Sequence, residues 1–155
     1  MLAQDDPTDL AIEALRSLRT SLHFAMMDAD NKILMITGPS PGVGKSFVSA
    51  NLGAVLAQTG QKVLVIDADM RKGRLHRYFQ SENKIGLSGY LSGHSAKEDI
   101  IQSSSIDNLD FIARGKAPPN PSELLMHERF KSLMASLSDE YDLILVDTPP
   151  ILAVT

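Results

Sequence analysis

The chain lacks several features that would place it in a whole class of proteins. It has 155 residues and no cysteine, which excludes disulfides and thiolate metal sites and agrees with a reducing cytoplasm. Its longest apolar runs, such as Val63–Ile66, are far too short to span a bilayer. The formal net charge is −4, which argues against nucleic acid as a partner. What remains is an ordinary globular composition, 43% hydrophobic, and enough length for one domain with a real core.

Hydrophobic patterning predicts strands that alternate with helices. Four short apolar runs have the composition of buried strands, at 32–37, 63–66, 109–113 and 143–146. Helices are expected at 8–28, 47–59 and 120–138, with short helices near 75–79, 87–91 and 97–101. The alternation predicts an α/β fold in which a parallel sheet is flanked by helices. In such sheets ligands bind at the carboxyl ends of the strands.

The three long helices have distinct faces. Thr8 is the expected N-cap of the first helix, and Asn120 followed by Pro121 marks the start of the last. The first helix repeats apolar residues at helical spacing: Ala11, Leu15, Leu18, Leu22 and Met26. The middle helix presents small residues and then a C′ glycine: Ala50, Gly53, Ala54, Ala57 and Gly60. The last helix is expected to face inward through Leu124, Phe130, Leu133, Met134 and Leu137.

The loop between the first two strands reads GPSPGVGKS over 38–46, and it has the composition of a phosphate-binding loop. Glycines let backbone N–H groups turn toward phosphate, and the helix that follows presents its N-terminus to the anion. Lys45 is expected to bridge the β- and γ-phosphates of ATP, and Ser46 to ligate Mg²⁺. The alternative is an ordinary glycine-rich turn, which leaves Lys45 and Ser46 unexplained. The predicted nucleotide-binding residues are Pro41, Gly42, Val43, Gly44, Lys45, Ser46 and Phe47.

Two strands end in aspartates. Asp147 follows four apolar residues, the Walker B form, and a carboxylate buried there needs a cation such as Mg²⁺. Asp67 and Asp69 share one side of an extended chain, and their strand can neighbour the strand that leads into the loop. We expect Asp67 to join the metal–water shell and to orient or deprotonate an attacking hydroxyl. The alternatives are a solvent-facing turn at Asp147 and a capping role for one of the other two. The predicted catalytic set is Lys45, Asp67, Asp69 and Asp147, and the predicted metal set is Ser46, Asp67 and Asp147.

Taken together, three segments resemble the catalytic domain of the bacterial tyrosine kinases of capsule and exopolysaccharide export, the BY-kinases. The segments are GPSPGVGKSFVSANLGAVLAQTGQKVLVIDADMRKG, GKAPPNPSELL and YDLILVDTPPILAVT. The resemblance implies a P-loop NTPase-like fold and transfer of the ATP γ-phosphoryl to protein tyrosines, mostly between subunits. It also implies a role in regulating polysaccharide synthesis and export.

The first half of the loop, GPSP, distinguishes this family from its relatives. Partitioning and septum-positioning ATPases carry K-G-G-x-G-K-[ST], whose first lysine reaches the nucleotide of a dimer partner. In this chain Ser40 occupies the position of that lysine and Pro41 the position of the first glycine. BY-kinases also lack the lysine and commonly have proline in the loop. An ATPase switch of the partitioning type stays the second hypothesis. A nucleotide-binding regulatory scaffold without kinase activity is the third.

The resemblance also implies partners and a location. Glu13, Arg16 and Arg19 fit the E-x-x-R-x-x-R pattern that builds a ring-like homo-oligomer in the family, although a solvated helix face is the simpler alternative. A membrane polysaccharide-export component, fused or separate, and a cognate phosphatase are expected partners. The expected location is the cytoplasm, at the inner face of the cell membrane. The tyrosine-rich tail of the family is not in this chain.

The sequence departs from the family pattern in two places. Several members have tyrosine directly after R-K-G, where this chain has Arg74, with Arg114 as the apparent counterpart of the arginine that pairs with that tyrosine. The basic residues here are Arg71, Lys72, Arg74, His76 and Arg77, and they either form a solvated face or hold phosphate or an acidic tail.

The second departure is length. The chain stops at Thr155, directly after the Walker B strand, so a partial kinase domain over 1–155 is expected. Within it, 8–28 is the oligomerisation helix and 32–155 the nucleotide-binding core. The three tyrosines are more typical of packing than of phosphate acceptors, at Tyr78, Tyr90 and Tyr141. The histidines form no ligand cluster, at His23, His76, His94 and His127.

Overall fold

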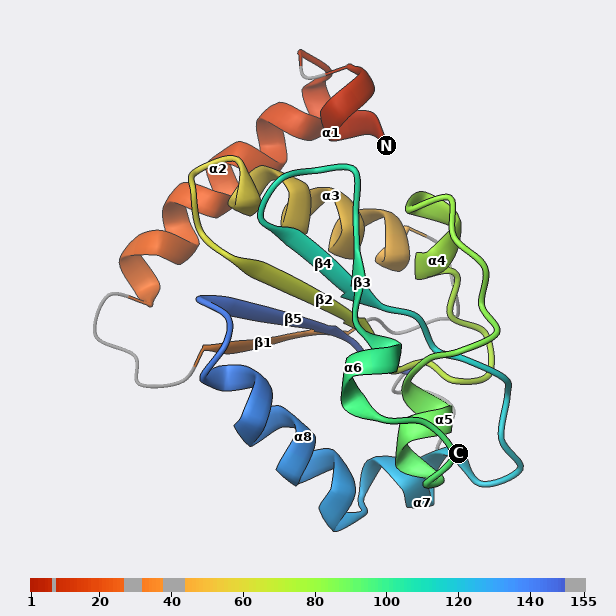
Figure 1. Ribbon diagram of the computed structural model, residues 1–155. Coiled ribbons are helices and arrows are strands. Elements are labelled where there is room, and N and C mark those ends of the chain that lie inside the picture. The colour runs from red at the N-terminus through yellow and green to blue at the C-terminus, as the bar shows by residue number, and fades with distance from the viewer. Residues whose placement is uncertain (7, 27–31, 38–43, 150–155) are drawn as a thin grey trace.

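A computed structural model describes residues 1–6, 8–26, 32–37 and 44–149 (Figure 1). The helices are α1 (Leu2–Asp5), α2 (Leu10–Ala25), α3 (Lys45–Ala57), α4 (Leu75–Tyr78), α5 (Leu87–Leu91), α6 (Lys97–Ile100), α7 (Pro121–Leu125) and α8 (Glu128–Ser138). The strands are β1 (Ile33–Ile36), β2 (Val63–Asp67), β3 (Gln102–Ser103), β4 (Leu109–Ile112) and β5 (Leu143–Asp147). The four strands expected from the sequence are confirmed, with bounds that differ by one residue at most ends.

One sheet holds all the described strands, in the order β1-β5-β2-β4-β3. The pairs β1/β5, β5/β2 and β2/β4 are parallel, which confirms the predicted parallel α/β fold. The two-residue strand β3 pairs antiparallel with β4 and was not predicted, because so short a strand leaves no period in the sequence. The expected adjacency of β2 and β1 is wrong, since β5 lies between them. This order places the end of β2 beside the end of β5.

Helices cover both faces of the sheet (Figure 1). On one face α3 packs against β2 and β5, and α2 lies over α3. Gly53 allows this close approach, because a Cβ there would come within 2.7 Å of the Val65 side chain. The other face is covered by α5 to α8, and its core includes Leu64, Ile66 and Ile144. The central strands β2 and β5 are buried along their whole length, as strands covered on both faces must be.

The first helix corrects two expectations. Asp9, not Thr8, caps α2, because its Oδ1 accepts a hydrogen bond from the Ala11 N–H at 2.8 Å. The buried residues of α2 are Ile12 and Leu15, whereas Ala11 is exposed and Leu18 is 41% exposed. The reason is geometric: α2 rests on another helix rather than on the sheet, so only a narrow strip of its surface is covered.

The helix expected over 120–138 is two helices. It breaks after Leu125, and α8 begins anew with His127 as its N-cap, whose Nδ1 accepts from the Arg129 N–H at 3.1 Å. Neither glycine nor proline marks this break, so helical periodicity ran through it. The inward face is otherwise as predicted. Leu124, Leu133, Met134 and Leu137 are buried and Phe130 is partly buried.

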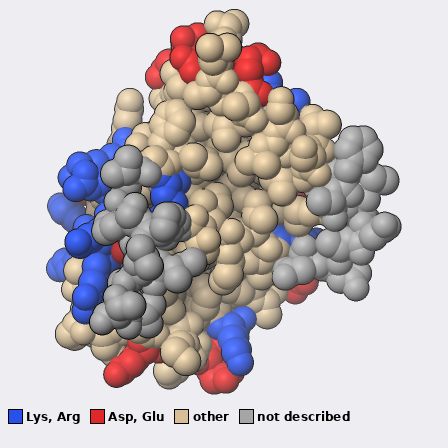
Figure 2. All heavy atoms as spheres, turned by 180° about the vertical axis from the view of Figure 1, so that it is seen from behind, with Lys and Arg blue, Asp and Glu red and all other residues tan. Residues whose placement is uncertain are grey.

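Charge is unevenly spread over the surface. Figure 2 shows Lys and Arg side chains gathered along one side of the molecule, which is the side of α4 in Figure 1. The exposed residues of this region include Arg71, Lys72, Arg74 and Arg77. The chain as a whole is acidic, so the concentration of positive charge here is local.

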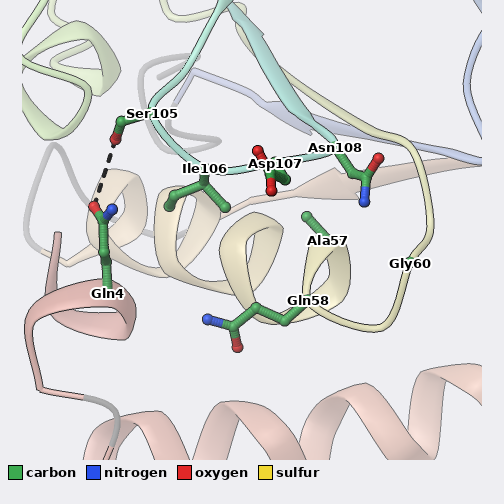
Figure 3. A pocket seen from close by; sticks show the side chains of 8 residues that line it. All are labelled: Gln4, Ala57, Gln58, Gly60, Ser105, Ile106, Asp107 and Asn108. Atoms are coloured by element: carbon green, nitrogen blue, oxygen red, sulfur yellow. Dashed lines mark hydrogen bonds between the residues drawn. The ribbon is translucent and has the colours of Figure 1, made fainter.

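A polar pocket lies at the amino ends of the strands (Figure 3). It has a volume of about 460 Å³ and is lined by Gln4, Ala57, Gln58, Gly60, Ser105, Ile106, Asp107 and Asn108. Gly60 and Asn108 lie just before β2 and β4, so the pocket opens at the edge opposite the strand ends that carry Asp67 and Asp147.

Candidate nucleotide site

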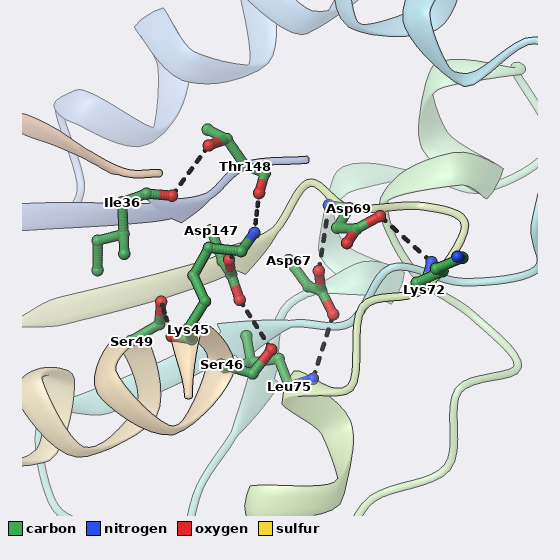
Figure 4. Close-up of polar contacts among 10 residues, drawn as sticks. All are labelled: Ile36, Lys45, Ser46, Ser49, Asp67, Asp69, Lys72, Leu75, Asp147 and Thr148. Carbon is green, nitrogen blue, oxygen red and sulfur yellow. Dashed lines mark hydrogen bonds and ion pairs between the residues drawn. The ribbon is translucent and has the colours of Figure 1, made fainter. Parts of the chain in front are cut away.

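Three elements bring the predicted site residues together at the carboxyl ends of the strands (Figure 4). Lys45 and Ser46 begin α3, and Asp67 and Asp147 end two adjacent parallel strands in register with each other. Gly44 precedes the helix with φ +78, a left-handed conformation that glycine adopts without steric cost. The site is therefore built where the α/β fold places its ligands.

Lys45 is held in the site by the end of β5. Its Nζ lies 2.7 Å from Oδ1 of Asp147 and also donates to the carbonyl of Thr148, and the side chain is almost fully buried. Thr148 is fixed in turn, because its backbone N–H and its Oγ1 both donate to the carbonyl of Ile36. A buried ammonium with one carboxylate and one carbonyl keeps donor capacity for a further anion.

Asp147 is almost completely buried, at 1% exposure, and Asp67 is completely buried. Its Oδ2 accepts a hydrogen bond from Ser46 Oγ at 3.0 Å. Burial raises the pKa of Asp147 above its ordinary value, while Lys45 and then Ser46 oppose that rise. Among the residues that the structure describes, Oδ1 accepts no hydrogen bond of good geometry and lies 2.7 Å from the Lys45 ammonium. A buried carboxylate oxygen left in this state favours a cation nearby.

This donor set fits Mg²⁺. A carboxylate and a hydroxyl are hard oxygen ligands, and Mg²⁺ usually keeps waters and substrate phosphates for its remaining positions. Among the described residues no group of three acidic or histidine side chains gathers as a metal site. Ser46 and Asp147, which contact each other, could hold the ion, and a metal contact of Asp67 stays a prediction.

Asp67 is fully buried, and within the described part of the chain it forms no ion pair. Its Oδ1 accepts from the N–H of Asp69 and its Oδ2 from the N–H of Leu75, each at 3.2 Å. Burial, followed by the charge of Asp147, raises the pKa of Asp67 to about 7, and the two amides only partly offset this rise. Asp67 is therefore poised to exchange a proton near neutral pH.

Gly73 is a site residue that sequence reasoning missed. A Cβ at this position would lie 2.1–2.4 Å from the carboxylate atoms of Asp67, so only glycine lets the backbone pass here. The residue is in the quoted R-K-G segment. Its contact with a strand-end aspartate six residues earlier leaves no mark in the sequence.

Asp69 is used by the turn that follows it. Its Oδ1 accepts from the N–H of Lys72 at 3.2 Å, and its carbonyl accepts from the N–H of Gly73 at 2.8 Å. The capping alternative is thus present in the structure. Asp69 is also close enough to raise the pKa values of both Asp67 and Asp147. A catalytic role for Asp69 stays a prediction.

Arg114 anchors the same turn from the end of β4. Its Nε donates to the carbonyl of Gly73 at 2.8 Å, and its Nη1 donates to the carbonyls of Met70 and Gly115. One guanidinium thus ties together two loops that border the site. Arg74, the residue directly after R-K-G, is exposed.

The remaining predicted residues fall into three groups. Ser40, Pro41, Gly42 and Val43 lie outside the described residues, and their phosphate contacts stay predictions. Phe47 packs edge-on against Tyr78 with ring centroids 6.2 Å apart, and Tyr78 packs against the core. A nucleotide contact of Phe47 stays a prediction. The remaining tyrosines also make internal contacts.

Those tyrosine contacts differ in kind. Tyr141 is buried and donates from its hydroxyl to Asp110 at 2.7 Å, and burial together with that bond raises its pKa. Tyr90 stacks under the guanidinium of Arg129 at 4.7 Å. Each tyrosine is therefore a packing residue in this structure, as predicted.

The proposed interface residues lie apart from the site, on α2. Glu13 and Arg16 form an exposed ion pair at 2.6 Å, and Arg19 is partly exposed. A single exposed pair contributes only a few tenths of a kcal/mol, about what the solvated-face alternative expects. Within the described ranges no helix combines the length and apolar character needed to cross a bilayer.

Comparison with known proteins adds a family. The family model described as an AAA domain matches residues 31–155. The tyrosine-protein kinase wzc of Salmonella typhimurium is 59% identical over 155 residues, which is all of this chain and 22% of that protein. The chain thus spans about a fifth of the length of the curated relatives it matches.

Among solved structures, a tyrosine kinase domain is more similar to the chain than a septum site-determining protein is. The kinase domain of the Escherichia coli tyrosine kinase ETK superposes with a TM-score of 0.95 at 56% identity, over 99% of this chain and 60% of that one. The septum site-determining protein MinD of Pyrococcus horikoshii, complexed with Mg-ADP, superposes with a TM-score of 0.66 at 28% identity, over 77% of this chain and 49% of that one. The chain belongs to the AAA-domain family, and it is similar to the bacterial tyrosine kinases among its relatives.

Proposed function

We propose that this chain is the nucleotide-binding part of a protein-tyrosine kinase that transfers the γ-phosphoryl of ATP to tyrosines, mainly between subunits. The observation that carries the proposal is the register of Asp67 with Asp147 beside Lys45 and Ser46. In this proposal Asp67 is a proton acceptor next to the side chains that would bind phosphate and metal. The similarity to the ETK kinase domain supports it further.

Each side chain has a defined task in this proposal. Lys45 and the amides at the start of α3 bind the phosphates, and Lys45 exchanges part of its contact with Asp147 for phosphate oxygen. Ser46 and Asp147 would hold Mg²⁺, which neutralises charge on the β- and γ-phosphates when bound. Asp67 orients the tyrosine hydroxyl and accepts its proton, a task suited to a pKa of about 7.

The chemical step balances with these groups alone. The tyrosine oxygen forms a bond to the γ-phosphorus as the bond to the β,γ-bridging oxygen breaks. The tyrosine proton passes to Asp67, and ADP leaves with the electron pair of the broken bond. Asp67 then releases the proton to water.

The wider setting is part of the same proposal. We place Glu13, Arg16 and Arg19 at the contact between subunits of a ring-like homo-oligomer, because this charged face of α2 is at least partly exposed and lies apart from the site. The acceptor tyrosines would come from a tyrosine-rich tail outside this chain. The proposed location is the cytoplasmic face of the cell membrane, with a membrane polysaccharide-export component and a cognate phosphatase as partners and with capsular or exopolysaccharide production as the regulated process.

The direct test is a phosphate map. The protein at its natural full length is incubated with Mg·ATP, and phosphorylated residues are identified by mass spectrometry. We expect phosphotyrosine that is lost in Lys45→Met and kept in Lys131→Met, which removes an exposed lysine from α8. ATP hydrolysis without any phosphotyrosine would instead favour the partitioning-type ATPase switch. Nucleotide binding with neither reaction would favour the regulatory scaffold.

The interface has a separate test. Glu13→Ala, Arg16→Ala and Arg19→Ala are combined in one variant, and particle mass is measured by light scattering. Dissociation of the oligomer supports the proposed contact. An unchanged mass would leave Glu13 and Arg16 as a solvated pair with no role in assembly.

A further inference from the structure

The turn after Asp69 carries a surface that the proposed chemistry does not use. We call it the basic surface and define it as Arg71, Lys72, Arg74 and Arg77, all of which are exposed. None of the four forms an ion pair with a carboxylate in the part of the chain that the structure describes. The sequence from 70 to 81 contains no Asp or Glu, and neither does 38–43 or 150–155.

The basic surface is fixed to the site rather than loosely beside it. The N–H of Lys72 and the N–H of Gly73 both donate to Asp69, and the N–H of Leu75 donates to Asp67. The backbone at Gly73 lies directly on the Asp67 carboxylate. A group bound by these cations is therefore held within one turn of the proposed proton acceptor.

Two further basic side chains, Arg114 and His76, lie close to the turn. Arg114 donates to the carbonyls of Met70 and Gly73, so its guanidinium lies under the basic surface. His76 lies close to Arg114 and Arg77. Its burial, and then the charges of these two arginines, lower its pKa. Because Asp67 and Asp69 are buried beneath the turn, its exposed charge is positive, and an anion is the partner that complements it.

The composition of the surface favours phosphate. Three of its four cations are arginines, whose planar forks bind phosphate through two parallel hydrogen bonds. The same cations would also attract an anionic lipid surface. Position decides between the two, because the surface borders the carboxylates that receive the substrate hydroxyl, and a membrane held there would cover the site.

We propose that the basic surface binds phosphotyrosine on the tyrosine-bearing segment that the kinase modifies, so that a segment phosphorylated once is preferred for the next transfer. This inference rests on the proposed kinase function and names its preferred substrate: tyrosine segments that already carry phosphate. It predicts phosphorylation in runs on one segment rather than scattered single events. It also predicts that added salt weakens the preference, because exposed charges are screened.

Binding provides the first test. Two synthetic peptides share one sequence with two tyrosines, and in one of them a single tyrosine is phosphorylated. Fluorescence anisotropy measures their affinity for the full-length protein, for Arg74→Gln/Arg77→Gln and for Lys32→Gln/Lys131→Gln. The last variant makes the same change in net charge at exposed lysines before β1 and on α8.

We expect the wild-type protein to bind the phosphorylated peptide about tenfold more tightly, since arginine–phosphate bonds are charge-assisted. The arginine variant should lose that preference, and the lysine variant should keep it. Equal binding of both peptides by the wild type would overturn the inference. So would a preference that survives in the arginine variant.

Activity provides the second test and separates the two proposals. The ratio of kcat/KM for the phosphorylated over the unphosphorylated peptide should fall about tenfold in the arginine variant only. Absence of tyrosine phosphorylation in the wild type, on either peptide, would refute the kinase function while the anisotropy result still decides whether the surface binds phosphotyrosine.

A vesicle arm tests the competing partner. Phosphatidylserine/phosphatidylcholine vesicles are sedimented with each protein. Loss of vesicle binding in the arginine variant, with an unchanged preference for the phosphorylated peptide, would overturn the inference in favour of a lipid surface. Equal sedimentation of all three proteins, with the peptide preference lost, supports it.

Discussion

The two edges of the sheet differ in what they bury. The carboxyl edge buries charge: Lys45, Asp67 and Asp147 are each less than 10% exposed. The amino edge holds the open pocket of Figure 3, whose lining is mostly uncharged, with side-chain amides from Gln4, Gln58 and Asn108. The pocket of Figure 3 therefore lies away from the buried charged groups at the carboxyl edge.

The difference shows what identifies a site in this fold. Burying a charge costs free energy unless a partner offsets it, so buried charges persist where they are used or paired. An open pocket lined by amides costs little and requires no function. The buried charges at the strand ends, rather than the volume of a hollow, mark the working edge.

Removal of the Lys45 charge should have the largest effect, because it takes away one of the buried charges that distinguish the carboxyl edge. In Lys45→Met the buried Asp147 loses its cation, and we expect transfer to fall about 1,000-fold. The free energy of unfolding should drop by about 3 kcal/mol at pH 8. The drop should shrink at pH 5, because protonation of Asp147 removes the unpaired charge. Calorimetry at both pH values checks this, with Lys131→Met as the exposed control expected within about 0.5 kcal/mol of wild type.

Asp67 should come next, with about a 100-fold loss of transfer in Asp67→Asn. Its pKa in the folded state is about 7 against an ordinary 3.8, so between these values the folded protein holds a proton that the unfolded chain has released. Stability should therefore fall as pH rises through this window, by about 1.4 kcal/mol for each unit at most. Asp67→Asn cannot ionise and should flatten this part of the curve, whereas Asp99→Asn, exposed on α6, should leave it unchanged. Urea unfolding from pH 4 to pH 8 measures both; a slope kept in Asp67→Asn would show that another group causes it.

Much of this edge could be predicted from the sequence, since its parts are short and local. Strand–loop–helix order placed Lys45 and Ser46 at the start of a helix, and apolar runs placed Asp67 and Asp147 at strand ends. Strand order was not accessible, because alternating elements fit several parallel sheets. The register of Asp67 with Asp147, which brings the site together, therefore came only from the structure.

The contacts made by Gly73 and Arg114 were also out of reach. Gly73 has the pattern of an ordinary turn glycine, and nothing in the sequence indicates that a Cβ there would meet the Asp67 carboxylate. Arg114 lies 41 residues after Gly73, and its hydrogen bonds go to backbone carbonyls, which have no sequence signature. Local patterns thus predicted the charged groups, and tertiary packing determined how they are held.

Substitution of Gly73 should have a smaller effect at the same carboxyl edge. In Gly73→Ala the new Cβ meets the Asp67 carboxylate, so we expect about a tenfold loss of transfer and about 2 kcal/mol less stability. Gly93→Ala is the matched control. Gly93 has φ +85 and open space around it, so alanine there should cost about 1 kcal/mol in backbone strain with no loss of transfer. Equal losses of transfer in the two variants would mean that the contact with Asp67 has no special importance.

The smallest effect is expected at the amino edge. Gln58 is exposed at the end of α3 and lines the pocket, and Gln58→Ala removes an amide that contacts no charged group of the site. We expect transfer within about twofold of wild type and stability within about 0.5 kcal/mol, the range of ordinary surface substitutions. A steady-state assay and thermal unfolding measure the two quantities. A loss of transfer near that of Gly73→Ala would reverse the contrast, since it would show that the uncharged edge is coupled to the reaction through α3, the helix that begins with Lys45 and ends beside the pocket.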